Sequence, residues 1–212
     1  MQPNWAEENL QTIRTLMERS AVYRRALAPI MLVTGSAGIL GSLVGVLAKC
    51  DSNAAFILLW LGVAVVSLIG SLLLVRRQAL NDSEPFWSPP TRRVAQALLP
   101  AFSVGLTVAM LALIVTAHGG MHDGGMQFML VMLWSWFYGC AAHAAGFFMP
   151  RGVRWLGWIY VLSGTGMLVG ISYGGSAVAQ ISPHIYMGAI FGGQHLAYGI
   201  YLYLTEKKSP IA

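Results

Sequence analysis

Two histidines, His143 and His195, stand inside long apolar stretches that contain no Asp, Glu, Lys or Arg. A neutral imidazole is a good iron ligand, so both are candidate cofactor-binding residues. Gly188, Gly192, His195 and Gly199 follow one another at steps of four, three and four residues. In a helix they would share one narrow face. A flat macrocycle can lie against a backbone without side chains, which makes haem the cofactor to consider.

Two histidines that share one haem need nearly the same depth in a membrane. His143 lies five residues from Phe148, the end of its stretch, whereas His195 lies nine residues from Leu204. At about 1.5 Å of rise per residue, their depths differ by about 6 Å, which argues against a shared haem. The simpler expectation is that no cofactor binds and that each imidazole bonds a backbone carbonyl or a nearby tyrosine: Tyr138, Tyr198 or Tyr201.

A second group of potential ligands lies beside the third and the last apolar stretch. Three imidazoles and one carboxylate could bind zinc or copper there: His118, His122, Asp123 and His184. The H-x-x-x-H spacing would align two imidazoles on a helix, but Gly119 and Gly120 between them disfavour a helix. The alternative is a polar turn whose histidines are solvated at the membrane surface.

The elements that must position these side chains are six charge-free segments, each 19 to 24 residues long. A bilayer core about 30 Å thick needs roughly 20 residues of helix to cross it. The chain has 56% hydrophobic and only 10% charged residues, against about 25% charged in soluble domains. We therefore expect an all-α bundle of six membrane spans, at 27–48, 54–75, 94–117, 125–148, 155–173 and 185–204.

The basic residues predict the orientation of these spans. Of 13 Lys and Arg residues, all but Lys49 lie before the first span, after the last one, or in the second and fourth connections. Positive residues in short connections stay in the cytoplasm, so both termini are expected on that side. Topology and attraction to anionic lipids then explain the net charge of +5, and no nucleic-acid partner is expected.

The chain is expected to divide into a cytoplasmic helix at 1–26, the membrane domain at 27–204 and a cytoplasmic tail at 205–212. Leucine, isoleucine and methionine recur at three- and four-residue steps in the first part, which indicates an amphipathic helix outside the bilayer. Such a helix either leads into the first span along the membrane interface or docks on a partner or a second copy.

Glycine pairs at G-x-x-x-G spacing lie inside the predicted spans and let helix backbones approach closely. They predict helix packing in a compact bundle, and they suit a homo-oligomer or a larger membrane complex. The pairs are Gly41 with Gly45, Gly166 with Gly170, and Gly188 with Gly192, and Gly199 extends the last face.

Side chains that usually carry protons and coupling ions are missing from the spans, which disfavours ion-coupled transport. Paired aspartates or an activated nucleophile for intramembrane proteolysis are missing as well. We therefore expect a non-enzymatic accessory, scaffold or sensor subunit that acts through helix packing and its first helix, with lipids and proteins as partners. The alternative is a redox protein with haem or a transition metal on the histidines above. A third hypothesis is that the protein is a facilitator for a small uncharged solute.

Two segments near the ends carry a resemblance. They read IRTLMERS at 13–20, followed by Tyr23 and Arg24, and FGGQHLAYG at 191–199. Both resemble uncharacterised bacterial inner-membrane proteins with several spans. The resemblance covers the two ends alone. It implies a bacterial inner membrane and draws attention to the helix that contains His195, but it implies no activity.

Overall fold

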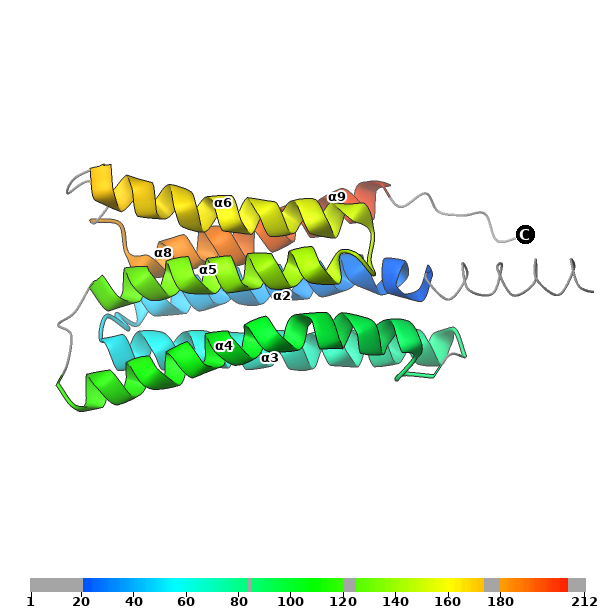
Figure 1. The fold of residues 1–212 in the computed structure, drawn as a ribbon, viewed down its shortest axis with the longest axis horizontal. Helices are drawn as coiled ribbons and strands as arrows, with labels where there is room; N and C mark the ends of the chain where they lie inside the picture. Colours follow the sequence, from blue (N-terminus) through cyan, green and yellow to red (C-terminus); the bar gives the residue numbers. More distant parts are fainter. Residues whose placement is uncertain (1–20, 84, 120–124, 174–179, 206–212) are drawn as a thin grey trace, which may run out of the picture.

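The computed structural model describes residues 21–83, 85–119, 125–173 and 180–205, and within these ranges every regular element is a helix. Successive long helices run antiparallel to one another (Figure 1). They are α2 (Ala21–Leu47), α3 (Asn53–Asn81), α4 (Pro89–Ala117), α5 (Gly125–Ala145) and α6 (Arg151–Tyr173). A last helical run comprises α8 (Pro183–Met187), η1 (Gly188–Gly193) and α9 (Gln194–Thr205).

Five of these helices, α2 to α6, are long and apolar enough to cross a membrane, with mean hydropathies from 1.3 to 2.6. Much of their apolar surface faces outward, as Leu58, Val65 and Leu72 do on α3. Such a surface is stable in lipid, where an exposed leucine loses nothing. The predictions of an all-α fold and of a multi-pass membrane protein are confirmed.

The sixth predicted span, 185–204, is helical but is not one α-helix. It consists of α8, η1 and α9, of 5, 6 and 12 residues, and η1 is a π-helix. A π turn bonds residue i to residue i+5 instead of i+4, so it interrupts the regular α-helical pattern. By helix length the described residues therefore contain five candidate spans, and a sixth crossing stays a prediction.

The connection predicted over 76–93 is much shorter in the structure. Helix α3 continues past Arg76 and Arg77 to Asn81, and α4 begins at Pro89. Ser88 is the N-cap residue of α4, and a proline fits the first turn because its missing N–H would have no partner there. Pro89 and Pro90 thus form the first turn of α4.

The end of α3 and the beginnings of α4 and α6 lie at the same end of the bundle, on the right in Figure 1. This end of the bundle is called the basic end below, because it carries six arginines: Arg76, Arg77, Arg92, Arg93, Arg151 and Arg154. The opposite end holds the turn between α2 and α3.

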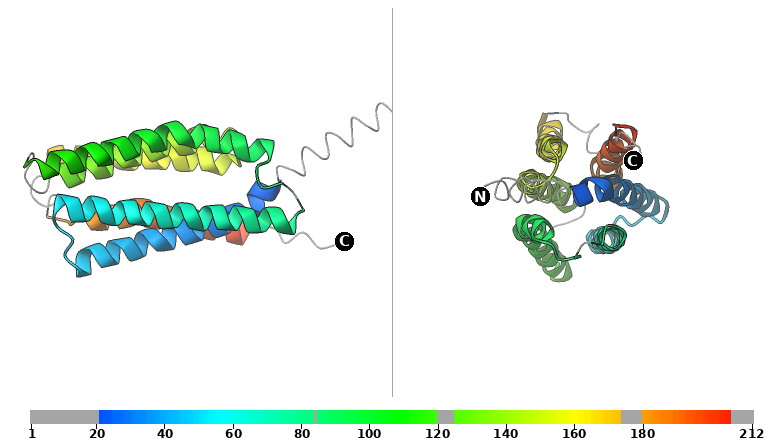
Figure 2. Two further views of the ribbon diagram at one scale, coloured as in Figure 1. Left: turned by 90° about the horizontal axis from the view of Figure 1, so that it is seen from below. Right: turned by 90° about the vertical axis from the view of Figure 1, so that its right-hand side faces the viewer.

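The helices form two groups of three (Figure 2). In the α2 triplet, α2 packs against α3 on one side and against the run α8–η1–α9 on the other. In the α5 triplet, α5 packs against α4 and α6 in the same way. The backbones of the two triplets approach each other mainly where α3 meets α4 and α5 and where α8 meets α5.

Within each triplet, glycines bring helix backbones into direct contact. A Cβ atom on Gly157 of α6 would lie 2.6 Å from the backbone nitrogen of His143 and 2.7 Å from the carbonyl oxygen of Gly139, both on α5. A Cβ atom on Gly38 of α2 would lie 2.8 Å from the Cα atom of Gly192. Real Cβ atoms do not approach this closely, so both helix pairs require glycine at these positions.

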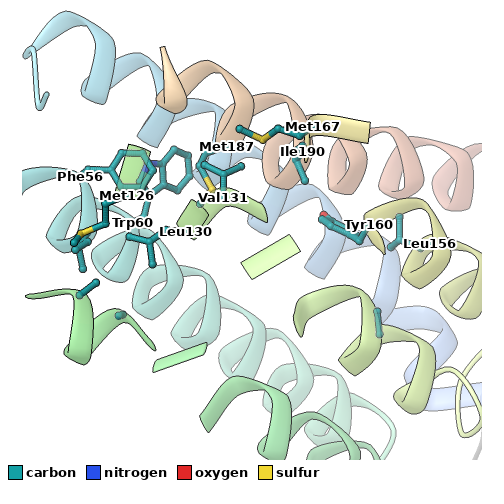
Figure 3. Packing of buried hydrophobic residues seen from close by; sticks show 14 of the residues in the cluster. Phe56, Trp60, Met126, Leu130, Val131, Leu156, Tyr160, Met167, Met187 and Ile190 are labelled. Atoms are coloured by element: carbon teal, nitrogen blue, oxygen red, sulfur yellow. The ribbon is translucent and has the colours of Figure 1, made fainter. Parts of the chain in front are cut away.

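Between the triplets, large side chains fill the space. The core cluster includes Phe56 and Trp60 of α3, Leu130 and Val131 of α5, and Tyr160 of α6 (Figure 3). The ring of Phe56 stacks on that of Trp134 of α5, with centroids 6.3 Å apart. The triplets thus meet through a layer of aromatic side chains. His184 and His195 lie in that layer, beside Phe56 and Tyr160 respectively.

Candidate functional site

The imidazole of His195 is buried between the two triplets, with 1% of the residue exposed. Its Nε2 atom lies 2.6 Å from the hydroxyl oxygen of Tyr138 on α5. Its Nδ1 atom lies 2.6 Å from the hydroxyl oxygen of Tyr160 on α6, and also 2.6 Å from the carbonyl oxygen of Phe191 on η1. These four residues are called the His195 cluster below.

The hydrogen bonds indicate where the protons of the His195 cluster lie. A carbonyl oxygen can only accept, so the contact with Phe191 places a proton on Nδ1 of His195. Nε2 then accepts from the hydroxyl of Tyr138, and the Tyr160 oxygen shares the proton on Nδ1. Both ring nitrogens are occupied, and the histidine joins α9 to two helices of the other triplet.

A second polar contact follows the same boundary. The side-chain amide of Gln194, next to His195, donates to the hydroxyl of Ser163 on α6 at 2.6 Å. Within the α5 triplet, the hydroxyl of Ser135 on α5 donates to the Tyr160 carbonyl on α6 at 2.7 Å. In an apolar surrounding such bonds satisfy groups that lipid cannot satisfy.

Haem does not fit the His195 cluster. An axial ligand needs a free nitrogen lone pair, and the Nε2 lone pair of His195 accepts from Tyr138. The glycines on the same run do not open a slot either, because they face α2: Gly188 abuts Ser42, Gly192 abuts Ile39, and Gly199 abuts Leu32. The π-helix shifts the helical register, so the glycines and the imidazole do not line one groove.

His143 lies in different surroundings from His195. It is half-buried on α5, and its ring meets those of Phe147 and Trp158 edge to face, with centroids 5.4 and 5.6 Å apart. Its Nδ1 atom is buried without a hydrogen-bond partner. The two intramembrane histidines therefore do not form a pair of ligands for one cofactor.

His184 is buried at the start of the last helical run, with 1% exposed. The indole N–H of Trp60 on α3 donates to its Nδ1 atom at 3.1 Å. The proton of His184 therefore lies on Nε2, which donates to the carbonyl of Cys50 at 3.1 Å. Gly45 of α2 leaves room for this ring, since a Cβ atom there would overlap it. His184 thus joins α2, α3 and α8.

Of the four residues of the predicted metal site, the structure describes two, His118 and His184, and each has its own hydrogen-bond partners. His118 is exposed at the end of α4, where its Nδ1 atom lies 2.8 Å from the Ile114 carbonyl oxygen. His122 and Asp123 lie outside the described residues. In the part of the chain that the structure describes, no three His, Cys, Asp or Glu side chains gather into a metal-binding group. Both nitrogens of His184 are already bonded.

Removing metal ions should therefore leave the stability of the protein unchanged. We expect the same unfolding temperature in detergent before and after EDTA treatment, because Trp60 and the Cys50 carbonyl hold the His184 ring without a metal. Differential scanning fluorimetry measures this, with Trp60→Phe as the variant that should lower it. A drop with EDTA that zinc reverses would contradict the assignment.

Some of the glycines predicted to pack helices contact another element closely, and others do not. Gly41 of α2 abuts Val63 and Trp60 of α3, and Gly45 abuts His184. On α6, a Cβ atom on Gly166 would have no atom within 4 Å, and Gly170 is half-buried. The closest glycine contacts of α6 use Gly152, which abuts Tyr198 of α9, and Gly157, which abuts the backbone of α5.

Sequence reasoning missed Tyr160, Trp60 and the contact between Gly139 and Gly157. Tyr160 could have been noticed as a polar side chain deep in the span 155–173, where it needs a partner. Trp60 offered the same signal in the span 54–75. The contact between glycines of two helices left no signal, because neither residue belongs to a G-x-x-x-G pair within its own helix.

Comparison with protein families, curated proteins and solved structures finds no match to this chain.

Proposed function

We propose that the protein is a non-enzymatic integral membrane protein, an accessory or scaffold subunit that acts through helix packing. One observation carries this proposal: the buried imidazoles of His195 and His184 both use their two nitrogens to join helices of the bundle. An imidazole that ligates a metal or haem iron needs a free nitrogen lone pair, whereas one whose two nitrogens are both bonded within the bundle makes the packing rigid and specific. The polar groups of these two imidazoles thus hold the helices in place.

The proposed topology has six crossings, with the last one formed by α8, η1 and α9, and with both termini in the cytoplasm of a bacterium. Two features support it. The last helical run lies along α2 over its length, and the basic end carries the arginines that are retained in the cytoplasm. Reporter fusions test it: alkaline phosphatase after residue 212 should be inactive, and a fusion in the connection 48–52 should be active.

The proposed partners are lipids and another membrane protein. The face of α3 with Leu58, Val65, Ile69 and Leu73 is exposed and apolar, as a lipid- or helix-binding surface would be. Residues 1–20 of the predicted docking helix lie outside the described residues, and 21–26 form the beginning of α2; this helix is a second proposed contact.

Purified protein should be colourless. We expect no Soret absorption, because no ring nitrogen of His195 is free for iron and His143 does not form a pair of axial ligands with it. An accessory subunit should also retain a second membrane polypeptide in constant ratio after mild detergent extraction. Absorption spectroscopy and quantitative mass spectrometry measure the two properties. A Soret band lost in His143→Leu would instead support the redox alternative, and a pure monomer in native-like nanodiscs would contradict the accessory role.

A further inference from the structure

An open groove of about 510 Å³ runs along α5 between α4 and α6. Its floor consists of small residues of α5, among them Gly139, Cys140 and Ala144, and its walls include Phe148 and Trp158. This volume falls within the range of about 300–1,000 Å³ that is typical of small-molecule sites. Cys140 on its floor is exposed.

His143 supplies a polar group to this apolar groove. Its Nδ1 atom is buried and unpaired, which is uncommon in native proteins and unfavourable in lipid. Since no acceptor lies within reach of Nδ1, the ring proton belongs on Nε2, where it can be donated to a bound molecule. An occupant that carries a hydrogen-bond acceptor can therefore bind this N–H, whereas Nδ1 keeps its unpaired lone pair.

The mouth of the groove at the basic end is positively charged. Arg93 precedes Ala97, a residue of the groove on α4, by one helical turn, and Arg154 precedes Trp158 on α6 by one turn. Side chains lean toward the start of their helix, so both arginines lean toward the basic end. The guanidinium carbon of Arg154 lies 5.2 Å from the centroid of the Phe147 ring.

Neither described carboxylate neutralises this mouth. Asp51 lies in the turn at the opposite end, and Asp82 accepts a hydrogen bond from Gln78 at the end of α3. From the mouth inward, the groove thus presents guanidinium groups, then an imidazole, then apolar floor. Gly146 abuts Arg154, and His143 lies three residues deeper, at about 4.5 Å.

We propose that this groove binds one anionic phospholipid. The phosphate lies between Arg93 and Arg154, the His143 N–H donates to an ester carbonyl one turn deeper, and an acyl chain lies on the floor at Gly139. Basic pockets between membrane helices bind anionic headgroups in this way. This specific site goes beyond the general lipid contact proposed above. It rests on the proposal that the protein is embedded in a membrane, and it does not depend on the proposed accessory role.

The charge requirement is tested by native mass spectrometry of the detergent-solubilised full chain, with phosphatidylglycerol and phosphatidylcholine added in competition. We expect one phosphatidylglycerol to be retained at least about tenfold better than phosphatidylcholine, and the preference to vanish in Arg93→Gln/Arg154→Gln. The control Arg76→Gln/Arg77→Gln removes the same charge from the same end, away from the groove, and should keep the preference. Equal retention of the two lipids would overturn the proposal.

The role of His143 is tested by His143→Phe, which keeps a ring in the groove. Wild-type protein should bind diester phosphatidylglycerol more tightly than the diether analogue, which lacks the ester carbonyls. The variant should bind both equally. A variant that keeps the ester preference would overturn the assigned hydrogen bond.

Cys140 reports where the lipid lies. In a Cys50→Ser background, phosphatidylglycerol should slow the reaction of Cys140 with N-ethylmaleimide severalfold, and this protection should be lost in Arg93→Gln/Arg154→Gln. Protection that follows protein concentration instead of lipid would mean that a second copy fills the groove. Absence of protection would place the lipid elsewhere. Either result overturns the proposal, and neither bears on the accessory role.

Discussion

Replacing Gly157 by alanine is expected to destabilise the protein by about 1–3 kcal/mol, as overpacking of a filled interface does. The added methyl group would lie 2.6 Å from the backbone nitrogen of His143 and 2.7 Å from the Gly139 carbonyl oxygen. Backbone atoms of a helix cannot move aside as the end of a flexible side chain can. Helices α5 and α6 must therefore separate along their length, which loosens every contact between them.

The matched control lies on the same helix. Gly166→Ala adds the same methyl group where no atom lies within 4 Å, so its effect should stay within about 0.5 kcal/mol. Unfolding by sodium dodecyl sulfate in mixed micelles, followed by circular dichroism, measures both variants. Equal stability of the two variants would mean that α5 and α6 are not in backbone contact.

Replacing His195 by leucine is expected to cost about 2–5 kcal/mol, because each buried polar group left without a partner costs about 1–3 kcal/mol. The orphaned groups are the hydroxyls of Tyr138 and Tyr160, whereas the carbonyl of Phe191 still lies within the helical backbone pattern. The loss should therefore exceed what the change in side-chain volume explains. His143→Leu serves as the control, since the unpaired Nδ1 of His143 leaves no group orphaned, and it should change stability far less.

A triple variant separates hydrogen bonding from packing. His195→Leu/Tyr138→Phe/Tyr160→Phe removes both orphaned hydroxyls together with the imidazole, so it should be more stable than His195→Leu alone, although it carries more substitutions. The same detergent titration compares them. If the triple variant is the least stable of the set, the tyrosine hydroxyls do not depend on His195.

The helical class and five of the spans followed from the sequence because lipid imposes one simple rule on composition. Every backbone group must be bonded within the segment, so a charge-free stretch of about 20 residues has to be a helix. Helix ends were harder to predict. Arg76 and Arg77 ended the apolar stretch but not α3, since a helix continues into water without needing apolar residues.

The site residues were predictable one at a time, but not as pairs. His195 stood out as a polar residue in an apolar stretch, and Tyr138 was considered among its partners. The π-helix before it was not foreseeable, because Gly188–Gly193 has no composition that distinguishes a π turn from an α turn. That turn decides which helix the glycines face and which helices His195 faces, so the groove expected around His195 does not form.

The tight packing of the last helical run on α2 can form only late in synthesis, because it joins an early part of the chain to a late one. The partner of Gly38 is Gly192, near the other end of the chain, so α2 enters the membrane long before its partner exists. At about 5–20 residues per second, roughly 10–30 seconds pass before α9 leaves the ribosome. During that interval the bare glycine face of α2 contacts lipid or a helper protein. An insertion chaperone that recognises small-residue helix faces would find its substrate in this nascent chain.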